Sequence, residues 1–369
     1  MDDLAIFPTL TGQYLAKRIC DSIKRRFNEE VKISPSIRKK FEDGTIITKI
    51  DESVRKKDCY VIGCMDDSVY KNPPEELIRE DIFPDLESMA SKKFQLTRNY
   101  NDNFMELLSY INALSSSEAM SVTAVVPTYP FARQERTRGR EPKLAKMAAE
   151  AMESAGANRI ISVDVHSPII EGFFSRFVKF QNLYSSSTII DYLKTKYAEV
   201  FKDFSVVAPD FGGIERARWY ADKFGVELIK SDKVKDYNST AKKIYKIEIT
   251  KDPKKVSFTV DDMIDTGGTF IELASEVKRR GGEDFYGATS HPLLNGPAIQ
   301  RLSEAYKEGK IKKIFITNTV NHFYDPEFFK KEGSTLDGLE WPEWIMIDDL
   351  LAQCIFNVHN RMSVSQLLK

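Results

Sequence analysis

Short apolar runs alternate with longer amphipathic stretches along most of the chain. The runs are rich in β-branched residues, which favour strands, and the stretches between them have the period of a helix. We expect strands at residues 59–63, 121–126, 159–163, 204–208, 255–260 and 313–317. We expect helices at residues 103–114, 142–154, 213–223 and 269–280. Apolar strands separated by helices predict an α/β fold of mainly parallel sheets flanked by helices.

Two segments interrupt this alternation. Residues 65–100 carry acidic positions and the Pro73–Pro74 pair, and the simplest interpretation is a solvated loop. Residues 321–344 are dense in aromatic side chains for a surface connection. Such a patch is either buried against another subunit or packed within the chain, and the sequence leaves both alternatives open.

Composition and charge narrow the class of ligand. The 369 residues suffice for two domains, and Lys plus Arg total 54 against 55 for Asp plus Glu. The chain as a whole therefore has no charge that favours nucleic acid or an anionic membrane. We expect no signal peptide, and the sequence has no apolar run of the ~18–20 residues that span a bilayer. Its four cysteines lack metal-site spacing and are expected to be reduced. We expect a cytoplasmic protein that binds a small phosphorylated ligand.

The most informative motif is VDDMIDTGGT at residues 260–269. A strand ends here and a helix begins, so free N–H groups of the first helical turn converge where the helix dipole favours an anion. Gly267 and Gly268 allow close approach of the backbone, and the hydroxyls of Thr266 and Thr269 add donors. We expect a phosphate site.

The adjacent acids Asp261 and Asp262 repel phosphate and suit sugar hydroxyls or a cation. A phosphate beside a diol describes ribose 5-phosphate. Taken singly, the acids are also compatible with some other metal site, and the Thr-Gly-Gly turn with a bare helix cap.

A second cluster follows the strand at residues 121–126. Arg133, Arg136, Arg138 and Arg140 form a group of forked donors suited to phosphate oxygens, although a solvated basic loop is the ordinary alternative. No Walker A loop accompanies it, and the DFG triplet at residues 210–212 lacks the other kinase motifs.

Asp164, His166 and Asp210 follow predicted strands and are able to bind a metal. Mg²⁺ prefers oxygen ligands and keeps several waters, so one or two protein ligands suffice. A lone histidine after a strand is also commonly structural.

Several separated motifs occur in one order along the chain: FEDG at 41–44, ESVR at 52–55, NDNFMELL at 101–108, ARQ at 132–134, DVH at 164–166, EGFF at 171–174, APDxGG at 208–213, VDDMIDTGGT at 260–269, GPA at 296–298 and VHNRMSVSQLL at 358–368. Together they resemble the ribose-phosphate pyrophosphokinase family over nearly the whole chain. The resemblance implies two tandem phosphoribosyltransferase-like domains, residues 1–182 plus 350–369 on the ATP side and residues 183–349 on the ribose 5-phosphate side. It also implies a homo-oligomer whose sites are completed by a neighbouring subunit.

The resemblance further implies that the anomeric hydroxyl of ribose 5-phosphate attacks the β-phosphorus of ATP and that AMP leaves. It assigns ATP binding to Phe41, Asp43, Thr45, Arg133, Gln134 and Arg140. It assigns ribose 5-phosphate binding to Asp261, Asp262, Asp265, Thr266, Gly267, Gly268 and Thr269. It assigns the cofactor Mg²⁺ to His166 and Asp210, and catalysis to Lys233, Arg133 and Lys235.

The chain departs from the family pattern at several positions. Thr45 stands where the family has an acid, and Lys235 where it has an arginine. Ile169 and Glu171 replace glutamines, both interrupting segments are longer, and the arginine-rich loop is one residue shorter. These departures leave open a regulatory subunit that binds nucleotides and turns over slowly. An ordinary phosphoribosyltransferase is a third alternative, although such a protein needs no ATP loop.

Overall fold

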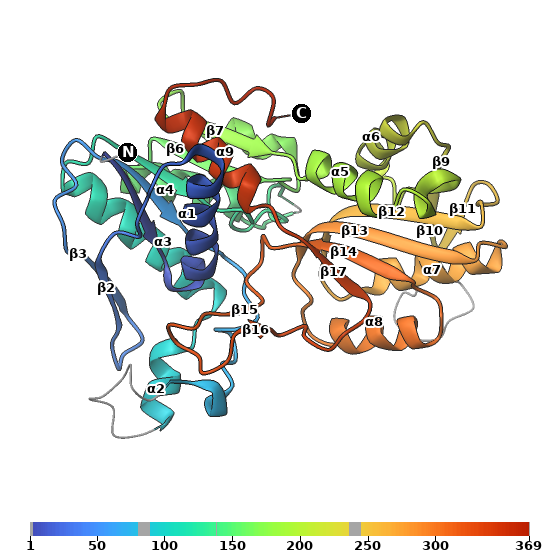
Figure 1. Cartoon of the computed structure of the whole chain (residues 1–369), viewed down its shortest axis with the longest axis horizontal. Helices are drawn as coiled ribbons and strands as arrows, with labels where there is room; N and C mark the ends of the chain where they lie inside the picture. Colours follow the sequence, from blue (N-terminus) through green and yellow to red (C-terminus); the bar gives the residue numbers. More distant parts are fainter. Residues whose placement is uncertain (1–2, 80–88, 138, 236–244, 369) are drawn as a thin grey trace. The chain divides into compact units, whose positions relative to one another are not determined.

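The computed structural model describes residues 3–79, 89–137, 139–235 and 245–368 (Figure 1). The chain forms two compact units. The first comprises Met1–Tyr184, Thr319–Asp337 and Ile347–Lys369, and the second comprises Ser185–Asn318 and Gly338–Met346. Residues 319–337 therefore pack with the first unit, whereas the family resemblance implies a second domain of residues 183–349.

A five-stranded parallel sheet forms the centre of the first unit. Its order is β1-β4-β5-β6-β7. The strands are β1 (Leu4–Pro8), β4 (Asp58–Ile62), β5 (Ser121–Val125), β6 (Arg159–Val163) and β7 (Lys179–Leu183). The helices of the unit are α1 (Gln13–Phe27), α2 (Met89–Leu96), α3 (Tyr100–Ser116), α4 (Leu144–Ala155) and α9 (Asp348–His359).

Alternate residues of these strands enter two separate cores, one on each face of the sheet. Ala5 and Phe7 of β1 pack with buried residues of α3 and α4. Leu4 and Ile6 pack with buried residues of α1 and α9, which lie side by side (Figure 1). Burial on both faces explains why the strands read as continuous apolar runs rather than as an alternating pattern.

A second, six-stranded sheet runs through the other unit in the order β17-β14-β13-β12-β8-β9. Its strands are β8 (Phe204–Val207), β9 (Leu228–Ile229), β12 (Val256–Ile264), β13 (Asp284–Pro292), β14 (Lys313–Thr317) and β17 (Pro342–Ile345). All neighbouring pairs are parallel. The helices are α5 (Ser186–Lys196), α6 (Ile214–Phe224), α7 (Gly268–Arg279) and α8 (Ala298–Lys307). The predicted α/β fold of mainly parallel sheets flanked by helices is confirmed.

Among the described residues, three antiparallel strand pairs stand apart from the two sheets. They are β2 (Ser36–Lys40) with β3 (Ile46–Ile50), β10 (Ser231–Lys235) with β11 (Tyr245–Ile249), and β15 (Phe323–Tyr324) with β16 (Gly333–Ser334). Four short 3₁₀ helices occur at Leu10–Gly12, Glu75–Leu77, Pro168–Phe173 and Val200–Lys202 in the described residues.

The two segments that interrupt the sequence pattern pack against each other. We call the described residues 65–79, 89–100 and 319–337 the excursion module. Ile78 forms a β-bridge with Phe329, and the N–H groups of Arg79 and Lys330 donate to the carbonyls of Phe328 (2.9 Å) and Leu77 (2.7 Å). The module has a small apolar core that it shares with Leu10 and that contains Val69, Tyr70, Ile78, Leu96, Phe328 and Phe329.

The packing of the excursion module bears on the predictions for residues 65–100 and 321–344. The interpretation of residues 65–100 as a solvated loop is wrong, because Val69, Tyr70 and Ile78 are buried. Phe328 and Phe329 are buried within the chain itself, which confirms the alternative of intrachain packing for these aromatic side chains. Apart from α2, the Glu75–Leu77 turn and the short β15–β16 pair, the described backbone of these segments is irregular, so the burial of Ile78 and Phe329 follows no strand or helix periodicity.

Candidate active site

The strand that carries the paired acids continues further than the sequence predicts. The apolar pattern ends at residue 260, but β12 extends to Ile264 because β13 pairs with it as far as Pro292. β8 pairs with β12 only up to Thr259. Asp261 and Asp262 therefore lie on the part of β12 that extends beyond β8, at the carboxyl edge of the sheet, where α/β proteins bind their ligands.

The turn into α7 requires glycine at residue 267. Gly267 has a φ of +77°, and a Cβ atom added there would lie 3.1 Å from Cγ of Leu302. The helix begins at Gly268, so the N-cap has no side chain and the N–H groups of the first turn lack intrahelical acceptors. The helix dipole and these donors favour an anion, which is compatible with the phosphate site that the sequence predicts here.

Arg216, in the first turn of α6, pairs with both acids. Its Nη1 lies 3.3 Å from Oδ1 of Asp261 and 3.2 Å from Oδ1 of Asp262. The sequence analysis missed this residue. One feature of the sequence could have indicated Arg216. It follows the Gly-Gly pair that ends the APDFGG motif, and a helix that begins there starts at the carboxyl edge of the sheet.

Burial and neighbouring charges determine the pKa of Asp261 in the Asp261–Asp262 pair. Burial and the adjacent Asp262 raise the pKa of Asp261 well above its ordinary value of 3.8, and Asp210 also raises it. The guanidinium of Arg216 lowers the same pKa, by less. The Asp261–Asp262 pair therefore holds a proton more readily than isolated carboxyls do. Such a pair can both accept and donate hydrogen bonds, which suits a diol.

The remaining predicted residues around this edge are held by local hydrogen bonds. Oδ1 of Asp210 accepts from the N–H of Gly213 at 3.1 Å, in the turn between β8 and α6. Oδ1 of Asp265 accepts from Nδ2 of Asn295 at 3.1 Å. The structure thus brings Asp210, Asp261 and Asp262 to one edge of the second unit.

The arginine-rich loop of the first unit is anchored at its start and exposed further along. The N–H of Phe131 donates to the hydroxyl of Tyr100 at 2.9 Å, and the Phe131 ring packs against those of Tyr100 and Phe104, at centroid distances of 5.1 and 5.6 Å. Phe131 has a φ of +55°. The side chains of Arg133, Gln134 and Arg140 are exposed. Arg138 lies outside the described residues.

His166 lies next to a backbone position of unusual geometry. Asp164, at the end of β6, is buried with a φ of +41°, and the N–H of Val165 donates to Oδ1 of Asn182 at 3.1 Å. The backbone turns sharply here and leaves His166 exposed. A non-glycine residue in this region of φ costs on the order of 1 kcal/mol and persists where the surrounding structure requires it.

The FEDG motif forms the tip of the β2–β3 hairpin. The N–H of Phe41 donates to the carbonyl of Thr45 at 2.8 Å. Oδ1 of Asp43 accepts from the N–H and the hydroxyl of Thr45 at 3.0 and 2.7 Å, which lowers the pKa of Asp43. Phe41 is 39% exposed, and Nζ of Lys39 lies 4.9 Å from its ring centroid. Thr45 therefore orders the turn of the hairpin.

The predicted catalytic lysines lie on β10. Lys233 pairs with Ile247 and Lys235 with Tyr245 through the backbone. Residues 236–244, between β10 and β11, lie outside the described part of the chain.

Neither a metal-binding cluster nor a membrane-spanning helix is found among the described residues. In the part of the chain that the structure describes, no three His, Cys, Asp or Glu side chains gather in a way that would hold a metal ion. Within the same residues, no helix is both long enough and apolar enough to cross a bilayer.

Comparison with known proteins identifies the family. A family model described as the N-terminal domain of ribose phosphate pyrophosphokinase matches residues 4–156, and a model described as the phosphoribosyl synthetase-associated domain matches residues 238–369. The ribose-phosphate pyrophosphokinase of Synechococcus elongatus is 31% identical over 370 residues, which cover 98% of this chain and 96% of the relative. The chain belongs to the ribose-phosphate pyrophosphokinase family.

Other members of the ribose-phosphate pyrophosphokinase family agree along the full length. The enzyme of Bacillus subtilis is 30% identical, with 99% of this chain and 97% of the relative covered. The crystal structure of phosphoribosylpyrophosphate synthetase from Mycobacterium smegmatis aligns with a TM-score of 0.75 at 27% identity and covers 97% of this chain and 99% of the other. The predicted family is confirmed, and so is the fold that it implies.

Proposed function

We propose that this chain transfers the diphosphate of ATP to the anomeric hydroxyl of ribose 5-phosphate, giving phosphoribosyl pyrophosphate and AMP. Membership of the ribose-phosphate pyrophosphokinase family supports this activity over that of a regulatory subunit. The observation that carries the proposal is the contact of Arg216 with Asp261 and Asp262, on the strand that leads into the N-terminus of α7. A phosphate group and a vicinal diol are the two features that distinguish a ribose phosphate.

In this proposal the second unit binds ribose 5-phosphate. The free N–H groups at Gly268 and Thr269 and the hydroxyl of Thr266 receive the phosphate, because helix N-termini favour anions. Asp261 and Asp262 bind the ribose hydroxyls, with Arg216 holding the two carboxyls together. Asp265 and Gly267 complete the loop. A sugar fixed at both ends loses most of its rotational freedom, which is a large part of catalysis in phosphoryl transfer.

The first unit binds ATP in the same proposal. Arg133, Gln134 and Arg140 are exposed at the end of β5, where guanidinium groups can pair with phosphate oxygens. Phe41 of the β2–β3 hairpin offers a ring for the purine, beside Asp43 and Thr45. A homo-oligomer in which a neighbouring subunit completes the site belongs to this proposal.

Charge on the reacting phosphates needs neutralisation, and Lys233, Lys235 and Arg133 are the residues proposed for it. Donors aimed at charge that develops in a transition state contribute roughly 10²–10³ in rate each. The Asp210 carboxylate, at the carboxyl edge of the second unit, is the kind of oxygen ligand that Mg²⁺ prefers, and substrate oxygens and water would complete the coordination. The family resemblance also assigns His166 of the first unit to Mg²⁺, which neutralises phosphate charge when bound.

Product analysis tests the activity. The purified chain is incubated with ATP, Mg²⁺ and ribose 5-phosphate, and the nucleotides and sugar phosphates are separated by ion-exchange chromatography. We expect AMP and phosphoribosyl pyrophosphate in equal amounts. Absence of both products would support the regulatory subunit. A second incubation supplies phosphoribosyl pyrophosphate and a nucleobase instead, and activity only there would support a phosphoribosyltransferase.

A further inference from the structure

The β2–β3 hairpin pairs with no third strand among the described residues, yet its tip carries Phe41. An isolated two-stranded hairpin is marginally stable in water, so its conformation depends on what packs against it. One face rests on α3. The outer edge of β2 is held by the excursion module.

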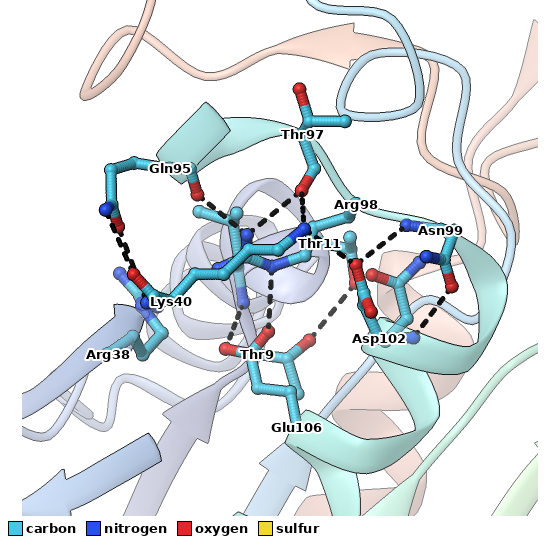
Figure 2. A network of polar contacts seen from close by, with 12 residues as sticks. Thr9, Thr11, Arg38, Lys40, Gln95, Thr97, Arg98, Asn99, Asp102 and Glu106 are labelled. Atoms are coloured by element: carbon cyan, nitrogen blue, oxygen red, sulfur yellow. Dashed lines mark hydrogen bonds and ion pairs between the residues drawn. The ribbon is translucent and has the colours of Figure 1, made fainter. Parts of the chain in front are cut away.

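The side-chain amide of Gln95, in α2, pairs with both backbone groups of Lys40 (Figure 2). Its Nε2 donates to the Lys40 carbonyl at 3.0 Å, and its Oε1 accepts from the Lys40 N–H at 3.4 Å. A primary amide presents one donor and one acceptor side by side, as a neighbouring strand does. Gln95 therefore satisfies the free edge of β2 at the residue that precedes Phe41.

The side chain of Lys40 adds a second attachment at the same place. Lys40 is buried, and its Nζ donates to the carbonyl of Thr97 at 3.1 Å and to Oδ2 of Asp102 at 3.0 Å (Figure 2). Asp102 in turn belongs to the capping box of α3 with Asn99. The end of β2 is thus tied to the start of a long buried helix.

Arg38 ties the hairpin to the other half of the module. Its guanidinium lies 5.9 Å from the ring centroid of Phe328, and Nη1 donates to the carbonyl of Pro8 at 3.2 Å. Arg38 and Lys40 point to one face of β2 because side chains alternate along a strand. Phe41 belongs to the opposite face and remains accessible to a ligand.

We propose that Gln95 is a positioning residue for nucleotide binding: by holding the backbone of Lys40 it fixes the hairpin tip and hence the ring of Phe41. This inference rests on the proposed function, in which Phe41 meets the purine of ATP. Gln95 itself touches neither substrate. The excursion module thereby acts on affinity for the nucleotide and not on the chemical step.

The test compares Gln95→Ala with Gln353→Ala in the full-length chain. Gln353 is a matched control because its amide also makes two hydrogen bonds, with Arg26 and Asn357, in the same unit. Hydrogen exchange followed by mass spectrometry reports the order of residues 36–50. We expect exchange in this segment to be roughly tenfold faster in Gln95→Ala and unchanged in the control. Unchanged exchange in Gln95→Ala would overturn the proposal.

Calorimetry then measures the dissociation constant of ATP. We expect a rise of roughly 5- to 30-fold in Gln95→Ala, the equivalent of one or two hydrogen bonds of ordinary strength, with ribose 5-phosphate binding within twofold of the unsubstituted chain. The double variant Gln95→Ala/Phe41→Ala should bind ATP as Phe41→Ala does, since Gln95 acts through Phe41. Two results would show that Gln95 has only a structural role and would overturn the proposal. One is a loss of ATP affinity in the double variant equal to the sum of the two single losses, and the other is an equal loss of affinity for ATP and ribose 5-phosphate in Gln95→Ala.

A failure of the proposed activity can be distinguished from a failure of the positioning role of Gln95. If the unsubstituted chain makes no phosphoribosyl pyrophosphate, the activity is refuted, while the exchange and ATP-binding comparisons still decide the role of Gln95. If product forms and Phe41→Ala leaves ATP binding unchanged, the activity stands and the positioning role is overturned.

Discussion

Nη1 of Arg216 lies 3.2 Å from Oδ1 of Asp262 and joins the first turn of α6 to the end of β12. The same nitrogen lies 3.3 Å from Asp261. Two adjacent carboxyls at the edge of a sheet repel each other, and Asp210 adds to the negative potential around them. The guanidinium of Arg216 offsets this repulsion, so we expect the geometry of the proposed diol site to depend on it.

Replacing Arg216 with methionine removes the guanidinium and keeps most of the apolar stem. We expect affinity for ribose 5-phosphate to fall roughly 10- to 100-fold, because charged hydrogen bonds contribute about 1.5–3 kcal/mol and the carboxyls lose their partner. Isothermal calorimetry measures the affinity. Arg218→Met, an exposed position on the same helix, is the control and should bind normally. Equal affinity of the two variants for ribose 5-phosphate would show that Arg216 does not contribute to the site.

Asp261→Asn should stabilise the free chain while it weakens sugar binding. The pKa of Asp261 is raised above 3.8 in the folded chain, so the folded state binds more protons than the unfolded state above that pH. The contribution of Asp261 to stability therefore falls as pH rises from about 4 toward neutrality. Asparagine carries no charge, and the melting temperature of the variant should exceed that of the unsubstituted chain increasingly over this range. A constant difference at all pH values would contradict the account, and so would undiminished affinity for ribose 5-phosphate.

His359 makes stability depend on pH in a separate place. Its Nδ1 lies 3.1 Å from Oδ2 of Asp58, and this contact raises the pKa of His359 above 6.5. The protonated histidine stabilises the folded chain fully below pH 6.5, and that stabilisation is lost as pH rises through the folded-state pKa. His359→Gln should remove about 0.5–1 kcal/mol at pH 6, after allowance for solvent screening, and much less at pH 9. Urea unfolding at the two pH values measures the difference. An equal loss of unfolding free energy at pH 6 and pH 9 would show that protonation of His359 is not the cause of the loss.

The core of the excursion module should contribute substantially to stability. Phe329 is 1% exposed and packs with Tyr70 at a ring-centroid distance of 5.7 Å. Phe329→Ala should lower the free energy of unfolding of the first unit by about 3–5 kcal/mol, the usual cost of truncating a buried phenylalanine. Phe177→Ala provides the control, since Phe177 is 71% exposed in the same unit. A loss below about 1 kcal/mol for Phe329→Ala would mean that the module is not a packed part of the fold.

The strands predicted from the apolar runs are all present, with ends that differ by at most one residue except for β12. Their pattern is unambiguous because both sheets are buried on both faces, as the two cores around β1 and β4 illustrate. Edge elements such as β7 and β17 carry polar and aromatic residues and give a weaker signal. The strand, turn and helix start around residues 261–269 can be predicted because they are contiguous in the sequence, and the assignment of this segment to ribose 5-phosphate stays a prediction.

Arg216 and the excursion module could not be predicted in the same way. Arg216 meets Asp262 across a crossover between neighbouring strands, a contact that one sequence does not specify. Ile78 and Phe329 pair over a separation of about 250 residues, and no periodicity marks either segment. Gln95 contacts the backbone of Lys40, and backbone contacts leave no complementary residue type to recognise.

The fate of the β-phosphorus of ATP tests the proposed activity most directly. ATP labelled with ³²P at the β-position is incubated with the chain, Mg²⁺ and ribose 5-phosphate, and the products are separated. We expect the label in phosphoribosyl pyrophosphate and none in the accompanying AMP, because attack at the β-phosphorus transfers both outer phosphates together. Label retained in ADP, with a ribose bisphosphate as the other product, would show transfer of one phosphoryl group and would contradict the account.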